Sequence, residues 1–161
     1  PFLVAYKDGS LTDVAQDFLN YIMSDDGQAI INEEGYISVA EGNTYTASGM
    51  SGRIVLAGST SVSPVMEVLA DAYKALNPDV TIEIQQTGSG AGITSAIEGV
   101  CDFGMSSRAL TDEEAAELVN TQIATDGIAV VVNNENPVED MTSDQIKGIY
   151  LGEITDWSEI Q

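Results

Sequence analysis

Apolar residues along this chain recur in some stretches at the three- to four-residue spacing of a helix, and in others in the short or alternating runs of a strand. Helical spacing predicts helices over residues 11–22, 26–34, 64–76 and 90–98, from 111 onward and over 142–151. Short apolar runs predict strands over residues 2–6, 53–57, 80–84, 102–106 and 127–133. Strands that alternate with helices indicate an α/β fold, with a mostly parallel sheet flanked by helices.

Residues with capping preferences mark several helix ends. Ser10 is a candidate N-cap of the first helix, and Ser63 is one for the helix that has Pro64 in its first turn. Capping boxes, in which a Ser or Thr is followed three residues later by Glu or Gln, begin at Thr111 and Thr142. These signals predict where the chain leaves each turn and enters a helix.

Residues 40–52 differ from their surroundings because they are polar and rich in glycine and serine. This composition predicts a linker between residues 1–39 and residues 53–133. The helix predicted over 11–22 has an apolar face that needs a partner surface, since burying one Leu or Phe side chain stabilises a fold by about 1.5–3 kcal/mol. We therefore expect the two flanking segments to fold as one unit.

Composition excludes several classes of protein. The 161-residue chain is 43% hydrophobic, which excludes disorder, and it has no apolar run near the roughly 20 residues that span a bilayer. Its formal net charge of −21 makes nucleic-acid binding and adsorption to anionic lipid unfavourable. The chain has no histidine, and Cys101 is its only cysteine, so zinc sites and Cys–His chemistry are excluded and no cofactor is expected.

Three turns rich in serine and glycine stand out, because each follows a predicted strand and precedes a predicted helix. They are Gly58–Pro64, Gly88–Gly92 and Met105–Arg108. Serine and glycine at a helix start expose backbone N–H groups at the positive end of the helix dipole, where a small anion is stabilised. The carboxyl ends of parallel strands meet at one edge of a sheet, so we expect the three turns there together.

Each turn also has an ordinary interpretation. The hydroxyls of Thr60 and Ser61 fit an N-cap cluster, Gly88–Gly92 fits a flexible strand-to-helix turn, and Arg108 fits a solvated surface side chain. The second turn is not a P-loop, because no Gly-Lys-Ser/Thr follows it. The coincidence of three such turns favours an oxyanion receptor over an enzyme, for which neither a metal cluster nor an activated nucleophile is visible.

Five stretches resemble a known family: AGSTSVSPVMEVLADAY, QQTGSGAGITSAI, DFGMSSRALTDEE, DGIAVVVNNENP and TSDQIKGIYLGEITDWSEI. Through them the chain resembles the substrate-binding proteins of bacterial phosphate ABC importers, which have a two-lobed, type II periplasmic-binding-protein-like fold. Residues 1–39 resemble the C-terminal segment of that family and residues 53–133 its N-terminal segment, so their order indicates the junction of a tandem or permuted gene. The resemblance implies that residues 1–161 form one lobe, in which residues 134–161 begin the crossover towards a second lobe.

The resemblance also implies a ligand and its contacts. The ligand would be inorganic phosphate, held by Thr60, Ser61, Ser89, Ser107 and Arg108 without a metal or cofactor and without enzymatic activity. The partner would be the membrane permease of the importer, which implies an extracellular, cell-surface lipoprotein or periplasmic location. Members of the family supply further donors from the second lobe, so this chain would hold about half of the site.

Two alternatives to phosphate binding stay open. Many relatives have an aspartate where Ser107 stands, so another tetrahedral oxyanion, such as sulfate or molybdate, is an alternative ligand. The second alternative is a non-binding interaction domain of a tandem receptor, which the intact Ser/Gly turns oppose.

Overall fold

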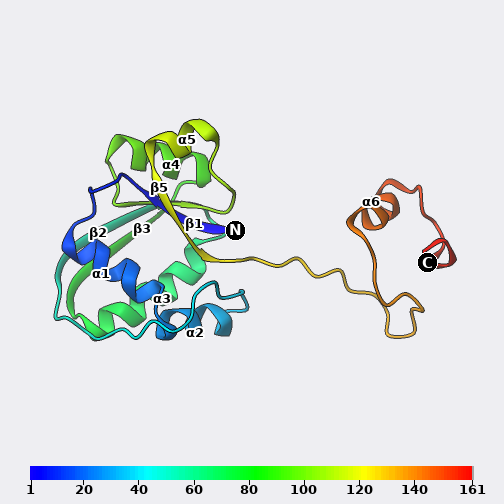
Figure 1. The fold of residues 1–161 in the computed structure, drawn as a ribbon, viewed down its shortest axis with the longest axis horizontal. Helices are drawn as coiled ribbons and strands as arrows, with labels where there is room; N and C mark the ends of the chain where they lie inside the picture. The colour runs from blue at the N-terminus through cyan, green and yellow to red at the C-terminus, as the bar shows by residue number, and fades with distance from the viewer. Residues whose placement is uncertain (161) are drawn as a thin grey trace. The chain divides into compact units, whose positions relative to one another are not determined.

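The computed structural model describes residues 1–160 of the chain, which divide into two compact units (Figure 1). The first unit, Pro1–Gly127, contains the sheet and the helices that cover it. The second unit, Ile128–Gln161, contains α6 (Ser143–Leu151) and the short 3₁₀ helix η1 (Trp157–Glu159). No helix within the described residues is both long enough and apolar enough to cross a membrane.

The sheet has five strands in the order β3-β2-β4-β1-β5. The strands are β1 (Phe2–Tyr6), β2 (Ser51–Gly58), β3 (Asp79–Gln86), β4 (Phe103–Ser106) and β5 (Val119–Ala124). β2 pairs in parallel with β3 and β4, whereas β1 is antiparallel to both β4 and β5. Four strands therefore point the same way and β1 runs against them, which confirms the α/β class and makes the sheet mixed.

Five helices complete the first unit, and their bounds lie close to the predicted ones. They are α1 (Asp13–Ile22), α2 (Asp25–Glu33), α3 (Ser63–Leu76), α4 (Ser89–Glu98) and α5 (Asp112–Glu117). The capping boxes predicted at Thr111 and Thr142 are both present, with the threonine side chain accepting from the amide three residues on. These two helix starts are confirmed.

Two predicted N-caps are wrong. Thr12 caps α1, because its side chain accepts from the amide of Ala15 at 3.3 Å, whereas the Ser10 hydroxyl closes a turn on the carbonyl of Lys7 at 2.8 Å. Ser63 lies inside α3 and its hydroxyl donates back to a carbonyl four residues earlier. Both serines make local side chain–backbone bonds that compete with capping.

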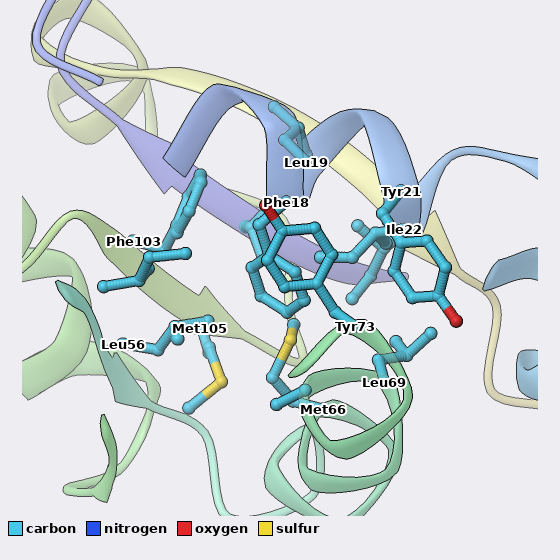
Figure 2. Packing of buried hydrophobic residues seen from close by; sticks show 14 of the residues in the cluster. Phe18, Leu19, Tyr21, Ile22, Leu56, Met66, Leu69, Tyr73, Phe103 and Met105 are labelled. Carbon is cyan, nitrogen blue, oxygen red and sulfur yellow. The ribbon is translucent and has the colours of Figure 1, made fainter. Parts of the chain in front are cut away.

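The two faces of the sheet are packed differently, because successive residues of a strand point to opposite sides. In Figure 1, α1, α2 and α3 lie on one side and α4 and α5 on the other. Large side chains fill the first side, where Phe18 and Tyr73 pack with ring centroids 5.0 Å apart in the same cluster as Phe103 and Met105 (Figure 2). The second side has a smaller cluster, in which Ala5, Ala57 and Ala96 leave room for α4 close to the strands.

Glycines set the distance between α4 and the sheet. A Cβ at Gly92, in α4, would lie 2.4 Å from the carbonyl oxygen of Ala57 in β2. A Cβ at Gly104, in β4, would lie 2.7 Å from the carbonyl oxygen of Gly92. The helix therefore rests directly on the strand backbones, and this contact fixes where its first turn lies.

The predicted linker packs against the helices through a hydrogen-bonded cluster. Tyr45, within it, and Tyr73, in α3, both donate to one carboxylate oxygen of Asp17 at 2.7 Å. Asn77 donates to the Tyr45 hydroxyl at 3.0 Å and accepts from the Met50 amide at 3.2 Å. Burial and the bond to Asp17 raise the pKa of Tyr73, which keeps its hydroxyl a donor. The cluster joins α1, the linker and α3.

The strand predicted over 127–133 is absent, and β5 takes its place beside β1 instead. Ile128 and Val131 are 95% and 88% exposed. A strand needs a neighbouring strand to accept its ladder hydrogen bonds, and within the described part of the chain no strand pairs with residues 127–133. Apolar composition alone therefore misled the prediction here.

Replacing Gly104 by alanine should destabilise the first unit by about 1–3 kcal/mol, because the added Cβ would meet the Gly92 carbonyl and force α4 off the sheet. Urea unfolding measures this change. Gly90→Ala is the matched control, since nothing lies within 4 Å of a Cβ there and alanine should be neutral or slightly stabilising. Equal stability of the two variants would contradict the close contact.

Asp17→Asn should lower the free energy of unfolding by about 1–2 kcal/mol, because two tyrosine hydroxyls would lose the carboxylate oxygen that they share as acceptor. Asp71→Asn on the exposed side of α3 is the control. Its carboxylate pairs with Lys74 at 2.8 Å on the surface, where such pairs contribute about 0.5 kcal/mol or less. If Asp17→Asn unfolds at the same denaturant concentration as the parent, the cluster does not join the segments.

Candidate anion-binding site

The three serine- and glycine-rich turns lie at one edge of the sheet, as the sequence predicted. β2 lies between β3 and β4 and runs parallel to both, with Gly58 opposite Gln86 on one side and Met105 on the other. The carbonyl of Gly58 accepts hydrogen bonds from the amides of Thr87 at 3.0 Å and Gly88 at 2.8 Å. The first turn is therefore bonded directly to the second.

Gly58 also brings the first turn against the third. Its φ is 145°, and a Cβ there would lie 2.2 Å from the carbonyl oxygen of Met105. The following amide, that of Ser59, donates to the same carbonyl at 2.9 Å. A side chain at position 58 would push β2 and β4 apart, so this position requires glycine.

Ser59 organises the first turn from inside. It is 2% exposed, its hydroxyl accepts from the Ser61 amide at 3.3 Å, and its carbonyl accepts from the Val62 and Ser63 amides. Thr60 and Ser61 beside it are exposed. Within residues 1–160, neither of their hydroxyls nor the Thr60 amide has a hydrogen-bond partner. These donors are free for a ligand.

The second and third turns touch through Ser89 and Ser107. The Ser89 hydroxyl accepts from the Ser107 amide at 3.3 Å, and the two hydroxyl oxygens lie 3.4 Å apart. Helix α4 begins at Ser89, and the amides of Ser89, Gly90 and Ala91 have no acceptor within the described chain. Such unpaired amides and the helix dipole make this helix start suitable for an anion.

Arg108 is held by its own loop and by α5. The buried Ser106 hydroxyl accepts from the Arg108 amide at 3.2 Å and donates to the Arg108 carbonyl at 2.8 Å. The guanidinium donates to the two carboxylate oxygens of Glu114 at 2.7 and 2.8 Å, and to the carbonyl of Ala109 at 2.8 Å. The predicted contact between Arg108 and an anion stays a prediction.

The Arg108–Glu114 pair remains ionised over the neutral pH range. Hydrogen bonds from the Arg108 guanidinium and the Thr111 amide lower the pKa of Glu114 to about 2. The same pair raises the pKa of Arg108. The site edge therefore combines neutral N–H and O–H donors with one internally paired cation.

All five predicted contact residues lie on turns that touch one another, and within the described chain four of them have side chains that are not paired with a charged group. These four are Thr60, Ser61, Ser89 and Ser107. The supporting roles of Ser59, Ser106 and Glu114 were not predicted. The capping box predicted that Glu114 lies in the first turn of a helix. The signal for its ion pair was the opposite charge of Arg108, six residues earlier. Among the described residues no group of three His, Cys, Asp or Glu side chains is placed to hold a metal ion.

Glu114→Gln should remove an acid-sensitive part of the stability. The folded-state pKa of about 2 lies below the ordinary value of 4.5, so ionised Glu114 stabilises the fold above about pH 4.5 and this contribution is lost as the pH falls towards about 2. The difference in unfolding free energy between parent and variant should shrink over that range, measured by urea unfolding at several pH values. Glu113→Gln is the control, and a parent–variant difference independent of pH would contradict the pairing.

Comparison with known proteins shows which family this chain belongs to. The profile of the PBP superfamily domain matches residues 43–161. The chain is 47% identical to phosphate-binding protein PstS 2 of Streptococcus agalactiae serotype V, over 99% of this chain and 55% of that protein. It is 42% identical to phosphate-binding protein PstS 2 of Streptococcus pneumoniae serotype 4, over 100% of this chain and 55% of that protein.

Two solved structures are similar to this chain. One is the phosphate-binding protein of a phosphate ABC transporter from Streptococcus pneumoniae TIGR4, with a TM-score of 0.92, 42% identity and coverage of 100% of this chain and 63% of that one. The other is a putative phosphate ABC transporter substrate-binding protein with bound phosphate from Clostridium perfringens, with a TM-score of 0.53 and 52% identity over 67% of this chain and 45% of that one.

The similarity extends to the order of the segments. The streptococcal relatives match over 99–100% of this chain, so in them too residues equivalent to 1–39 precede those equivalent to 53–133. This chain spans 55% of their length. With the profile match over residues 43–161 and the mixed sheet flanked by helices, this similarity shows that the chain belongs to the PBP superfamily.

Proposed function

We propose that this chain binds inorganic phosphate as part of the substrate-binding component of an ABC-type phosphate importer. The observation that supports this most directly is the convergence of three Ser/Gly turns at the carboxyl edge of β2, β3 and β4. The relatives that are 42–47% identical are named phosphate-binding proteins, and one similar structure holds phosphate. The partner is then a membrane permease, and the protein works outside the cell or in the periplasm.

The donors at this edge suit a tetrahedral oxyanion. Phosphate oxygens accept hydrogen bonds, and the edge offers the free Thr60 amide, the first amides of α4 and the hydroxyls of Ser61, Ser89 and Ser107. The N-termini of α3 and α4 both lie beside these turns, so their dipoles add favourable potential. Arg108, the residue after Ser107, supplies a full positive charge.

The hydroxyls of these turns bind rather than react. A serine nucleophile needs a general base within hydrogen-bond distance. In the described residues, Ser59 accepts from an amide, Ser63 and Ser106 donate to carbonyls, and Ser89 and Ser107 contact each other. None of them is bonded to a carboxylate or another base, which supports a receptor without enzymatic activity.

Sulfate is the second candidate ligand, and one observation favours it. Within residues 1–160, no carboxylate is hydrogen-bonded to the turn residues Thr60, Ser61, Ser89 or Ser107. A carboxylate would accept the proton of hydrogen phosphate and reject sulfate, which has no proton to donate. This edge consists of donors, so we expect phosphate and sulfate to compete for it.

The described chain should bind phosphate weakly, with a dissociation constant of about 0.1 mM or weaker, which corresponds to no more than about 5.5 kcal/mol. Thr60, Ser61 and Ser107 are exposed, so a bound anion keeps part of its hydration. An NMR titration with inorganic phosphate measures affinities in this range. Micromolar binding by the 161-residue chain would contradict the prediction that a bound anion stays partly hydrated at this exposed edge.

In the same titration, Ser89→Ala should weaken phosphate binding by about 1–3 kcal/mol, as expected for a hydrogen bond to a charged group. Ser95→Ala is the matched control on the same helix, because the Ser95 hydroxyl donates to the Ala91 carbonyl at 2.9 Å, one turn further along. Resonances of the three turns should shift on binding. If phosphate shifts other resonances only, or the two variants bind alike, the site assignment is wrong.

A further inference from the structure

The Arg108 guanidinium uses only one of its two bidentate edges. A guanidinium presents one edge through its two terminal nitrogens and another through Nε and Nη2. Nη1 and Nη2 donate to the two oxygens of Glu114, and Nη1 also donates to the Ala109 carbonyl. Within residues 1–160, Nε–H has no acceptor, so the Nε–Nη2 edge is unoccupied.

Glu114 is itself fixed, so it determines how Arg108 is oriented. It is the third residue of α5, its amide donates to the Thr111 hydroxyl at 3.3 Å, and one of its carboxylate oxygens accepts from the Thr111 amide at 2.8 Å. That capping box ties the carboxylate to the start of the helix. The side chain of Glu114 is 18% exposed, less than the 44% of Arg108. The Arg108–Glu114 pair is therefore anchored to the start of α5 through Glu114.

We propose that Glu114 is a positioning residue for anion binding, which holds Arg108 so that its free Nε–Nη2 edge binds an oxyanion at the Ser107 turn. This inference rests on the proposed function of that edge as a phosphate site. The bond to Glu114 fixes a long, flexible side chain before the ligand arrives. The Arg108 side chain then loses less conformational freedom when the anion binds, so the binding is stronger.

The alternative role for Glu114 predicts the opposite sign. If the carboxylate merely competes with phosphate for Arg108, its removal frees the guanidinium and deletes one negative charge, so Glu114→Gln binds phosphate more tightly. If Glu114 positions Arg108, the same variant binds more weakly even though the chain is less negative. The direction of the change therefore separates the two roles.

The test is an NMR titration of the full 161-residue chain with inorganic phosphate. Glutamine at position 114 can keep the capping box, so α5 should remain folded. We expect Glu114→Gln to weaken binding about 3- to 10-fold, the effect of leaving one long side chain unfixed. Arg108→Lys should weaken it at least as much, because lysine has no bidentate edge. The double variant should bind no more weakly than Arg108→Lys, because the two residues act as a unit.

Glu113→Gln is the matched control, since it removes the same charge from the neighbouring position, and Glu113 is not bonded to Arg108. A second readout is the Nε–H resonance of Arg108, which is easily assigned because the chain has only two arginines. It should shift on adding phosphate in the parent, and its guanidinium rotation should become faster in Glu114→Gln.

The outcomes distinguish this inference from the proposed function. If phosphate binds and Ser89→Ala weakens it, but Glu114→Gln binds as well as or better than Glu113→Gln, the positioning role is wrong and the phosphate site stands. If the Arg108 Nε–H resonance does not respond to phosphate in the parent, the free edge is not the contact. If phosphate shifts no resonance of the three turns, the proposed function fails and this inference fails with it.

Discussion

The sheet depends on one inserted strand, β1, which lies between β4 and β5 and hydrogen-bonds to both in the antiparallel sense. β4 has only four residues, so it needs a partner on each side to be held in place. Val4 and Ala5 of β1 also bury opposite faces, one in each hydrophobic cluster. The segment that begins the chain therefore secures the strand that ends at the Ser106–Arg108 turn.

Close backbone contacts connect this sheet to the candidate site and fix the positions of its turns. Gly58 lets the start of the first turn lie against the Met105 backbone in β4, and the Gly92–Gly104 contact sets α4 directly on the sheet. Because strands and helix touch through backbone atoms, the first turn of α4 has little freedom to move away from the other two turns. The bond from the Ser107 amide to the Ser89 hydroxyl is possible only at this spacing. Small residues inside the fold therefore determine the geometry of the donors at its edge.

Sequence reasoning predicted elements whose signals are local and missed those that depend on distant partners. The capping box at Thr111 and the helical face of α3 follow from residues a few positions apart, and both were predicted. β5 reads VNTQIA, in which half of the residues are polar, and it is held as a strand by its pairing with β1. The run at 127–133 is more apolar but has no such partner in the described residues. The sequence predicted that the three turns lie together because the carboxyl ends of parallel strands meet at one edge. The ion pair between Arg108 and Glu114 could not be predicted in the same way, because it depends on the conformation of the loop between them.

The strongly negative charge of the chain is compatible with an anion site built mainly from neutral donors. A net charge of −21 repels anions, but at physiological salt that repulsion is screened over about 8 Å, so the groups within one or two contacts decide binding. At this edge the Arg108 charge is balanced by Glu114, and the remaining donors are amides and hydroxyls. Such groups bind an anion through oriented dipoles and require no excess of positive charge. A strongly acidic chain is therefore compatible with the anion site proposed at this edge.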